Sequence, residues 1–261
     1  MRPTVMNSSA DPAPVLEVDQ LGVTFSDEKG SLRVLQEITF SVEKEQFICV
    51  VGPSGSGKST LIRVLAGLLP PSTGKVQLYG EALTRPRRGV GIVFQKANLM
   101  PWRTVLKNIT LPLEVLNVPE EESSQRALDL VKLVGLEGFE DWYPRDLSGG
   151  MLQRVAIARS LIHHPDVLLM DEPFGALDAL TREKMGTELL RIWQARKKTV
   201  IMITHDIPEA VFLADRVLAI SPQPGRLNLD LHIDIPRPRH EEDRYSSQFV
   251  GYTQQLRKAI Q

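Results

Sequence analysis

The segment from residue 46 to Pro70 constrains the fold more than any other. QFICVVG (46–52) is apolar without alternation, as expected of a strand buried on both faces. The glycine-rich run PSGSGKST follows, and it leads into KSTLIRVLAGLL, where leucines recur at helical spacing until Pro70. A strand, a glycine-rich loop and a helix in this order predict the start of an α/β unit.

The glycine-rich loop has the composition of a phosphate-binding site. GPSGSGKST (52–60) matches G-x-x-x-x-G-K-[ST] in full, with the required strand before it and helix after it. Glycines let backbone N–H groups approach phosphate oxygens, and the helix N-terminus adds a partial positive charge. Lys58 would reach the β- and γ-phosphates, and Ser59 would ligate Mg²⁺. The predicted ATP-binding residues of this loop are Gly52, Pro53, Ser54, Gly55, Ser56, Gly57, Lys58, Ser59 and Thr60.

Two further strands end in residues suited to phosphate chemistry. VLLMDE (167–172) is an apolar strand ending in Asp171, at the edge where open α/β sheets bind ligands. Asp171 is predicted to hold Mg²⁺ through its water shell, and Glu172 to accept a proton from an attacking water. His205 ends TVIMITH at the same rim, which favours a γ-phosphate contact over capping or packing. Asp-Glu alone would be an ordinary helix start, and the loop around Lys58 makes the catalytic interpretation the better one.

The rest of the chain alternates strands and helices, which indicates a mostly parallel sheet flanked by helices. VLEVDQLGVTF and RVLQEITFSV read as two half-buried strands joined by a polar turn. A helix opens after Pro119 within a helical insertion, and the tail offers a strand-like LNLDLHIDI and a short terminal helix. The predicted organisation is a disordered lead (1–14), a main domain (15–221) with a helical subdomain inserted at about 96–160, and a C-terminal extension (222–261).

The composition and net charge of the chain limit the kinds of partner that it can bind. The chain has 261 residues and a formal net charge of −1, so it carries no global basic field to attract nucleic acid. No run approaches the roughly 18 apolar residues of a membrane span. Cys49 is the single cysteine, which fits a reducing compartment. We therefore expect a soluble, cytoplasmic protein without a nucleic-acid partner, whose link to the membrane comes through another subunit.

LSGGMLQR (147–154) is the decisive motif. With the phosphate loop, Gln95, MDEP, ALD and His205, it makes the chain closely resemble the ATPase subunit of an ABC transporter over roughly residues 15–221. The resemblance implies an α/β P-loop NTPase fold with an N-terminal antiparallel β subdomain and an inserted helical subdomain. It also implies ATP and Mg²⁺ as ligands, a head-to-tail homodimer, transmembrane permease subunits and, indirectly, a solute-binding protein.

Roles for individual residues follow from this resemblance. The signature residues Ser148, Gly149, Gly150 and Met151 would contact the γ-phosphate of ATP held on the other subunit, at a helix N-terminus. Asp178, in the loop Ala176-Leu177-Asp178 that resembles the D-loop, would lie at the dimer interface.

Two more positions gain roles by resemblance. Gln95 would bind Mg²⁺ and ATP and couple the attacking water to the membrane partner, so that it joins Lys58, Glu172 and His205 as a catalytic residue. Phe25 stands where the family carries an aromatic residue stacked on adenine, and core packing is its alternative.

The segment FQKANLMPWRTV (94–105) places several apolar side chains directly after Gln95. In importers that the chain resembles, this region lines the groove that receives a short helix of the membrane subunit. Leu99, Met100 and Trp102 are therefore predicted to contact that subunit. The alternative is that Trp102 packs inside the helical subdomain.

Met151, where many family members have Gln, and the sequence after Gln95 both resemble the nitrate/sulfonate/taurine importer group. We expect uptake of a small anion such as nitrate, a sulfonate, taurine or bicarbonate, at the cytoplasmic face of the cell (inner) membrane. An importer for another small molecule, for example a thiamine precursor or an aromatic acid, is the alternative. A nucleic-acid-linked ABC ATPase is disfavoured because residues 96–146 hold no sustained heptads. A non-catalytic homologue is disfavoured because the motif residues are intact.

Overall fold

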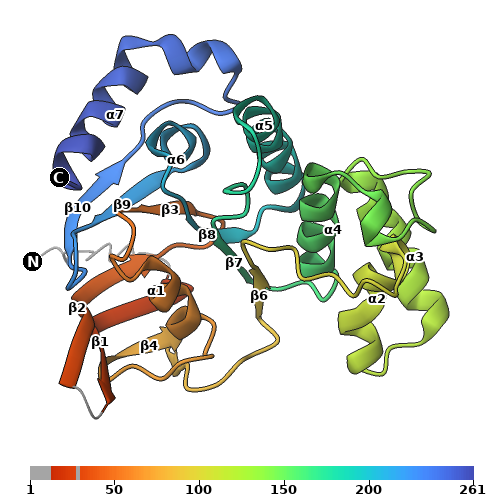
Figure 1. Cartoon of the computed structure of the whole chain (residues 1–261), viewed down its shortest axis with the longest axis horizontal. Helices are drawn as coiled ribbons and strands as arrows, with labels where there is room; N and C mark the ends of the chain where they lie inside the picture. Colours follow the sequence, from red (N-terminus) through yellow and green to blue (C-terminus); the bar gives the residue numbers. More distant parts are fainter. Residues whose placement is uncertain (1–12, 28–29) are drawn as a thin grey trace, which may run out of the picture.

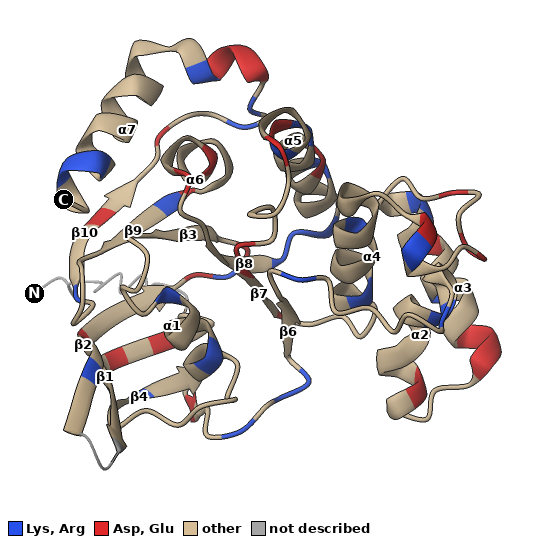
Figure 2. Cartoon of the chain, in the orientation of Figure 1, with Lys and Arg blue, Asp and Glu red and all other residues tan. Residues whose placement is uncertain are grey.

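A computed structural model describes residues 13–27 and 30–261. Apart from Ala13 and Pro14, the predicted disordered lead lies outside the described residues. In the described part, two sheets and two groups of helices form the architecture in Figure 1. Positively and negatively charged segments are mixed along the ribbon in Figure 2, in accord with the net charge of −1.

The central sheet has the strand order β10-β9-β3-β8-β7-β6. The four pairs within β9-β3-β8-β7-β6 are parallel, and β10 adds an antiparallel edge. β3, β7 and β8 are almost wholly buried, which explains their unbroken apolar sequences. The strands are β3 (Phe47–Val51), β6 (Val90–Val93), β7 (Val167–Asp171), β8 (Thr199–Ile203), β9 (Arg216–Ile220) and β10 (Leu227–His232).

The second sheet is antiparallel and has the order β2-β1-β4-β5. Its strands are β1 (Leu16–Asp27), β2 (Gly30–Val42), β4 (Thr73–Leu78) and β5 (Glu81–Ala82). The side chains of this sheet and of α1 (Lys58–Leu65) share one apolar core with one face of the central sheet. At residue 35, β2 also makes a bridge to Gly225, just before β10.

Helices cover the other face of the central sheet and share a second core. α2 (Val105–Val115), α3 (Glu120–Leu133) and α4 (Gly149–Leu161) form the helical group at the right of Figure 1. α5 (Ala179–Arg196), α6 (Ile207–Leu213) and α7 (Ser247–Ala259) complete that face, with short 3₁₀ turns η1 (Pro144–Asp146) and η2 (Glu241–Tyr245). No helix in the described ranges is long and apolar enough to cross a membrane.

The C-terminal extension is tied to α6 by two arginines. Arg239 is 5% exposed, and its Nη1 donates to the carbonyls of Val211, Phe212 and Ala214 at 3.0, 3.0 and 2.7 Å. Burial lowers the pKa of this guanidinium to about 10. Arg237 donates from Nη2 to Leu213 O at 2.6 Å and pairs with Asp215, just after the helix, at 2.7 Å. The carbonyls at the end of a helix lack intrahelical partners, so these bonds complete the C-terminus of α6.

The predicted fold class is confirmed: a mostly parallel sheet flanked by helices, with an antiparallel sheet beside it. The expected strand at 227–235 is shorter, since β10 ends at His232. Two features were not anticipated, the strands β4 and β5 and the helix α2, which contains Pro112.

Candidate nucleotide-binding site

The glycine-rich loop joins β3 to α1, as its pattern requires. Gly57 has φ of +93°, and a Cβ there would lie 2.7 Å from Leu35 Cδ2, so only glycine fits against β2. Lys58 Nζ donates to the carbonyls of Gly52 and Pro53 at 2.9 and 2.8 Å. The side chain of Lys58 therefore folds back onto its own loop, and the loop's carbonyls hold its ammonium group in place.

Charge and burial at the loop suit an anionic ligand. Burial lowers the pKa of Lys58, and the neighbouring carboxylates of Glu172 and Asp171 oppose this effect. Ser56 Oγ is buried and has no hydrogen-bond partner among the described residues. A buried hydroxyl without a partner costs free energy unless a ligand or water satisfies it. A bound phosphate oxygen would satisfy it.

Ser59 and Asp171 form the second part of the site. Ser59 Oγ donates to Asp171 Oδ1 at 3.0 Å, which joins the first turn of α1 to the carboxyl end of β7. Burial raises the pKa of Asp171, and the bond from Ser59 opposes the rise. A hydroxyl and a carboxylate are hard oxygen ligands of the kind that Mg²⁺ takes together with substrate phosphates and water. These residues fit the metal predicted for this position.

Glu172 and His205 are brought together from two adjacent strands. Glu172 directly follows β7, and its Oε2 lies 3.0 Å from Nδ1 of His205, which is the second residue after β8. Glu172 has φ of +44°, a left-handed conformation that is rare for this residue, and its N–H donates to Ile203 O at 3.0 Å. A Cβ on Gly175 would lie 3.4 Å from both Glu172 Oε2 and Gln95 Nε2. The side chains of Gln95, Glu172 and His205 therefore converge.

The signature residues lie at the start of α4. Ser148 caps this helix, with its Oγ accepting from Met151 N at 3.4 Å, and Gly149 begins the helix. A Cβ on Gly149 would lie 3.1 Å from Leu177 Cδ2, so the signature contacts the Ala176–Asp178 loop of its own chain. Asp178 caps α5 by accepting from Thr181 N at 3.0 Å.

Phosphate loop and signature belong to opposite faces of the central sheet. α1 packs into the core shared with the antiparallel sheet, whereas α4 packs into the core on the other face. The structure thus brings together the predicted residues of the loop, of β7 and of β8, whereas the helix that begins with the signature packs on the other face of the sheet.

Two aromatic predictions concern exposed side chains. Phe25 is 46% exposed and lies opposite Leu32 in the β1–β2 pair, so the alternative of core packing is wrong. Trp102 is 72% exposed, so the alternative that it packs inside the helical subdomain is also wrong. Leu99 does pack against the helical core.

Sequence reasoning missed several residues that hold this site in shape. Gln153 of α4 donates from Nε2 to Gln95 O at 2.7 Å, and Arg159 donates to Ala97 O and Asn98 O at 2.7 and 2.9 Å. The helix that carries the signature therefore fixes the segment after β6. The sequence holds no signal for these links, because their acceptors are backbone carbonyls, which every residue offers.

Three features meet at one edge of the sheet: the phosphate loop, the carboxylate that ends β7 and the histidine that follows β8. Together with the helical group that carries LSGGM, they define an ATP-binding cassette. The family model described as ABC transporter matches residues 35–175. An ATP-binding cassette solved as a dimer bound to ADP and Pi superimposes with a TM-score of 0.74 at 31% identity, covering 85% of this chain and all of that one.

Three curated relatives extend over most of the chain. An ABC transporter ATP-binding protein of Methanocaldococcus jannaschii is 48% identical and covers 92% of this chain and 89% of its own length. The nitrate import ATP-binding protein NrtD of Synechocystis is 47% identical, covering 85% and 83%. The taurine import ATP-binding protein TauB of Rhizobium johnstonii is 46% identical, covering 85% and 86%. The chain therefore belongs to the ABC transporter family, as the resemblance predicted. It is an ATP-hydrolysing, ATP-binding subunit of that family.

Proposed function

We propose that this subunit powers the uptake of a small anion, such as nitrate, a sulfonate, taurine or bicarbonate, through partner permease subunits at the cytoplasmic face of the cell membrane. The names of the nitrate and taurine import relatives support the substrate class. A solute-binding protein outside the membrane would select the anion. Import of a different small molecule, a thiamine precursor or an aromatic acid, is the second candidate.

The observation that carries the catalytic proposal is the convergence of Glu172, His205 and Gln95 beside the phosphate loop. Backbone N–H groups of residues 54–60 and the Lys58 ammonium would hold the ATP phosphates. Ser59, Asp171 and Gln95 would hold Mg²⁺, which neutralises developing phosphate charge.

Proton transfer is assigned to Glu172. Its carboxylate accepts a proton from the attacking water, while His205, 3.0 Å away, orients that carboxylate and contacts the γ-phosphate. Gln95 positions the same water from the segment that leads to the helical subdomain. Phe25, exposed on β1, supplies a face for the adenine.

Each chain has one phosphate loop and one signature, so a complete site would take two chains. In a head-to-tail dimer, Ser148–Met151 of each chain would contact the γ-phosphate bound to the other, and Asp178 would lie between the chains. ATP then contacts both chains only in the closed dimer, so it favours closure, and hydrolysis removes that preference. The solved dimer bound to ADP and Pi supports this arrangement.

Glu172→Gln tests the catalytic assignment. Turnover should fall roughly 10²–10⁴-fold, because the amide cannot accept the proton, while ATP affinity stays unchanged. Phosphate release and binding of a fluorescent ATP analogue measure the two quantities. Lys58→Ala is the contrasting variant and should weaken nucleotide binding itself. Retained hydrolysis in Glu172→Gln would refute the assignment.

The permease contact is proposed at Leu99, Met100 and Trp102. Asn108, fully buried on α2, holds this segment by four hydrogen bonds, accepting from Met100 N at 2.7 Å and donating to the carbonyls of Met100, Arg103 and Thr104 at 3.1, 2.9 and 3.0 Å. The segment is thus rigidly supported while Trp102 remains exposed. Exposed aromatic anchors on a rigid support are typical of interface hot spots.

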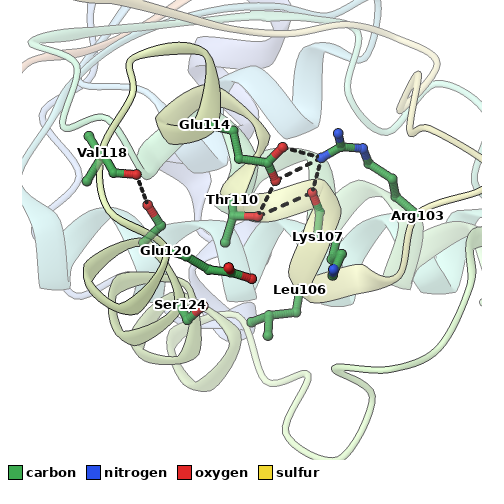
Figure 3. A pocket seen from close by; sticks show the side chains of 9 residues that line it. Arg103, Leu106, Lys107, Thr110, Glu114, Val118, Glu120 and Ser124 are labelled. Atoms are coloured by element: carbon green, nitrogen blue, oxygen red, sulfur yellow. Dashed lines mark hydrogen bonds and ion pairs between the residues drawn. The ribbon is translucent and has the colours of Figure 1, made fainter.

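Beside this segment lies a groove of about 460 Å³ between α2 and α3 (Figure 3). Arg103 pairs with Glu114 at 2.7 Å, and this bond lowers the pKa of Glu114. Leu106 and Val118 give the groove apolar walls. The other lining residues, such as Lys107 and Glu120, are polar or charged, so an amphipathic helix of the permease would fit this groove. Trp102→Ala should abolish co-purification with the permease and leave the ATP affinity of the isolated chain intact; unchanged co-purification would contradict the contact.

A further inference from the structure

Arg182, in the first turn of α5, joins two loops that the catalytic proposal treats separately. Its Nη2 donates to Leu177 O at 3.1 Å, and its Nη1 donates to Asp206 Oδ2 at 3.1 Å. The side chains of Arg182 and Asp206 are 23% and 28% exposed, so the pair is only partly screened by water. A single guanidinium therefore bridges the D-loop and the residue that follows His205.

On the side of His205, the bridge reaches a tightly bonded turn. Asp206 N donates to Thr204 Oγ1 at 3.0 Å, and Asp206 Oδ1 accepts from Glu209 N at 3.0 Å, capping α6. His205 lies between these two anchored residues, and its ring contacts Glu172 at 3.0 Å. A shift of Asp206 must therefore move His205 relative to Glu172.

On the other side, the bridge reaches the predicted dimer interface. Leu177 precedes Asp178, and its side chain is in contact range of Gly149 in the signature of the same chain. Asp178 and Arg182 share the first turn of α5, where Arg182 N donates to Asp178 O at 2.9 Å. The position of the D-loop is thus linked both to the signature and to Arg182.

We propose that Arg182 is a positioning residue that couples the D-loop to His205, so that docking of a second chain sets the orientation of His205 against Glu172. This inference rests on the proposed dimer mechanism. Arginine suits the task because its planar fork presents two N–H groups in fixed directions to two acceptors. Lysine retains the positive charge but cannot hold both acceptors in this geometry.

Arg182→Lys is the test, measured with the full-length chain. We expect kcat for phosphate release to fall about tenfold, the effect of losing one charge-assisted hydrogen bond from the positioning of His205. KM and the affinity for a fluorescent ATP analogue should stay within twofold of the wild type, because Arg182 touches no predicted nucleotide-binding residue. Lys184→Gln removes an exposed positive charge from the same helix and serves as the matched control, with unchanged kcat.

A double-mutant cycle with Asp206→Asn locates the effect. Asparagine still caps α6, so this variant keeps the helix start and weakens the bond to Arg182, although it also removes a carboxylate charge near Glu209. The double variant should turn over no more slowly than the slower single variant, since both changes break the same bridge. Turnover is expressed per nucleotide bound, so that a loss of folded protein does not imitate a loss of coupling.

Three results would overturn the proposal: wild-type kcat in Arg182→Lys, additive losses in the cycle, or parallel losses of nucleotide affinity and kcat. The first result would show that a positive charge at residue 182 is enough for full turnover and that the two-acceptor geometry of arginine is not needed. The last would show that Arg182 only supports the fold. Failure of the proposed function itself looks different, because the wild-type chain would then bind ATP without releasing phosphate.

Discussion

Replacing Glu209 with glutamine is expected to stabilise the protein at neutral pH and to leave its stability almost unchanged in acid. Glu209 lies on α6, is 7% exposed, and its Oε1 has no hydrogen-bond partner in the described part of the chain. Burial raises its pKa from 4.5 to about 7, and the nearby Asp206 carboxylate adds to the rise, while a hydrogen bond with the Thr204 side chain opposes it first and Arg182 and His205 oppose it less. Ionising this side chain in the folded state is therefore costly.

The direction in which stability changes with pH follows from the number of protons that Glu209 binds in the folded and unfolded states. Between pH 4.5 and about 7 the folded chain holds a proton on Glu209 that the unfolded chain has lost. Stability contributed by this residue is thus fully present below pH 4.5, declines as pH rises, and is constant above about pH 7. At about 1.4 kcal/mol per pH unit, the loss amounts to about 3 kcal/mol.

Urea unfolding from pH 4.5 to 8, followed by circular dichroism, measures this effect. The difference in unfolding free energy between Glu209→Gln and the wild type should grow from near zero to about 3 kcal/mol in favour of the variant. Other titrating groups cancel in that difference. Glu137→Gln, which removes an exposed loop carboxyl, serves as the control substitution. A flat difference for Glu209→Gln would refute the reasoning.

Three further substitutions test contacts that support the site. Asn108→Leu removes four hydrogen bonds and leaves Met100 N and Arg103 O without a partner, so the unfolding free energy should fall by about 2–4 kcal/mol, and an unchanged urea midpoint would contradict this. Gln153→Leu removes the bond to Gln95 O and should lower phosphate release several-fold with nucleotide affinity retained; full turnover would show that the bond is dispensable. Arg239→Met removes the buried donors at the end of α6 and should cost at least about 3 kcal/mol in urea unfolding, whereas a cost below about 1 kcal/mol would exclude a structural role.

The parallel sheet, and the edge of it that carries the phosphate loop, could be predicted from the local pattern of apolar and polar residues. Strands such as β3 are buried on both faces, and this requires unbroken apolar sequence. Residues at strand ends, such as Asp171 and His205, then share an edge by topology alone. In contrast, α2 contains β-branched residues and Pro112, which lacks the N–H for an intrahelical bond and hides the helical pattern. Packing in the helical group and the cap from Thr104 outweigh these local preferences.

The supporting residues of the site could not be read from the sequence for a different reason. Arg182 and Gln153 donate to backbone carbonyls far along the chain or in another loop. Every residue offers a carbonyl, so the acceptor leaves no trace in the amino-acid pattern. The exposed state of Trp102 was likewise undetermined, because its position depends on how Asn108 bonds the segment from Met100 to Thr104.

The left-handed backbone conformation of Glu172 creates a trade-off between folding stability and ATP hydrolysis at this position. A non-glycine residue at φ of +44° carries strain of order 1 kcal/mol, which glycine or asparagine would lower. Selection for thermal resistance alone would therefore replace Glu172, and the more robust protein would lack its proposed general base. Libraries screened for heat tolerance should keep this codon fixed, since a gain there would come at the direct expense of turnover.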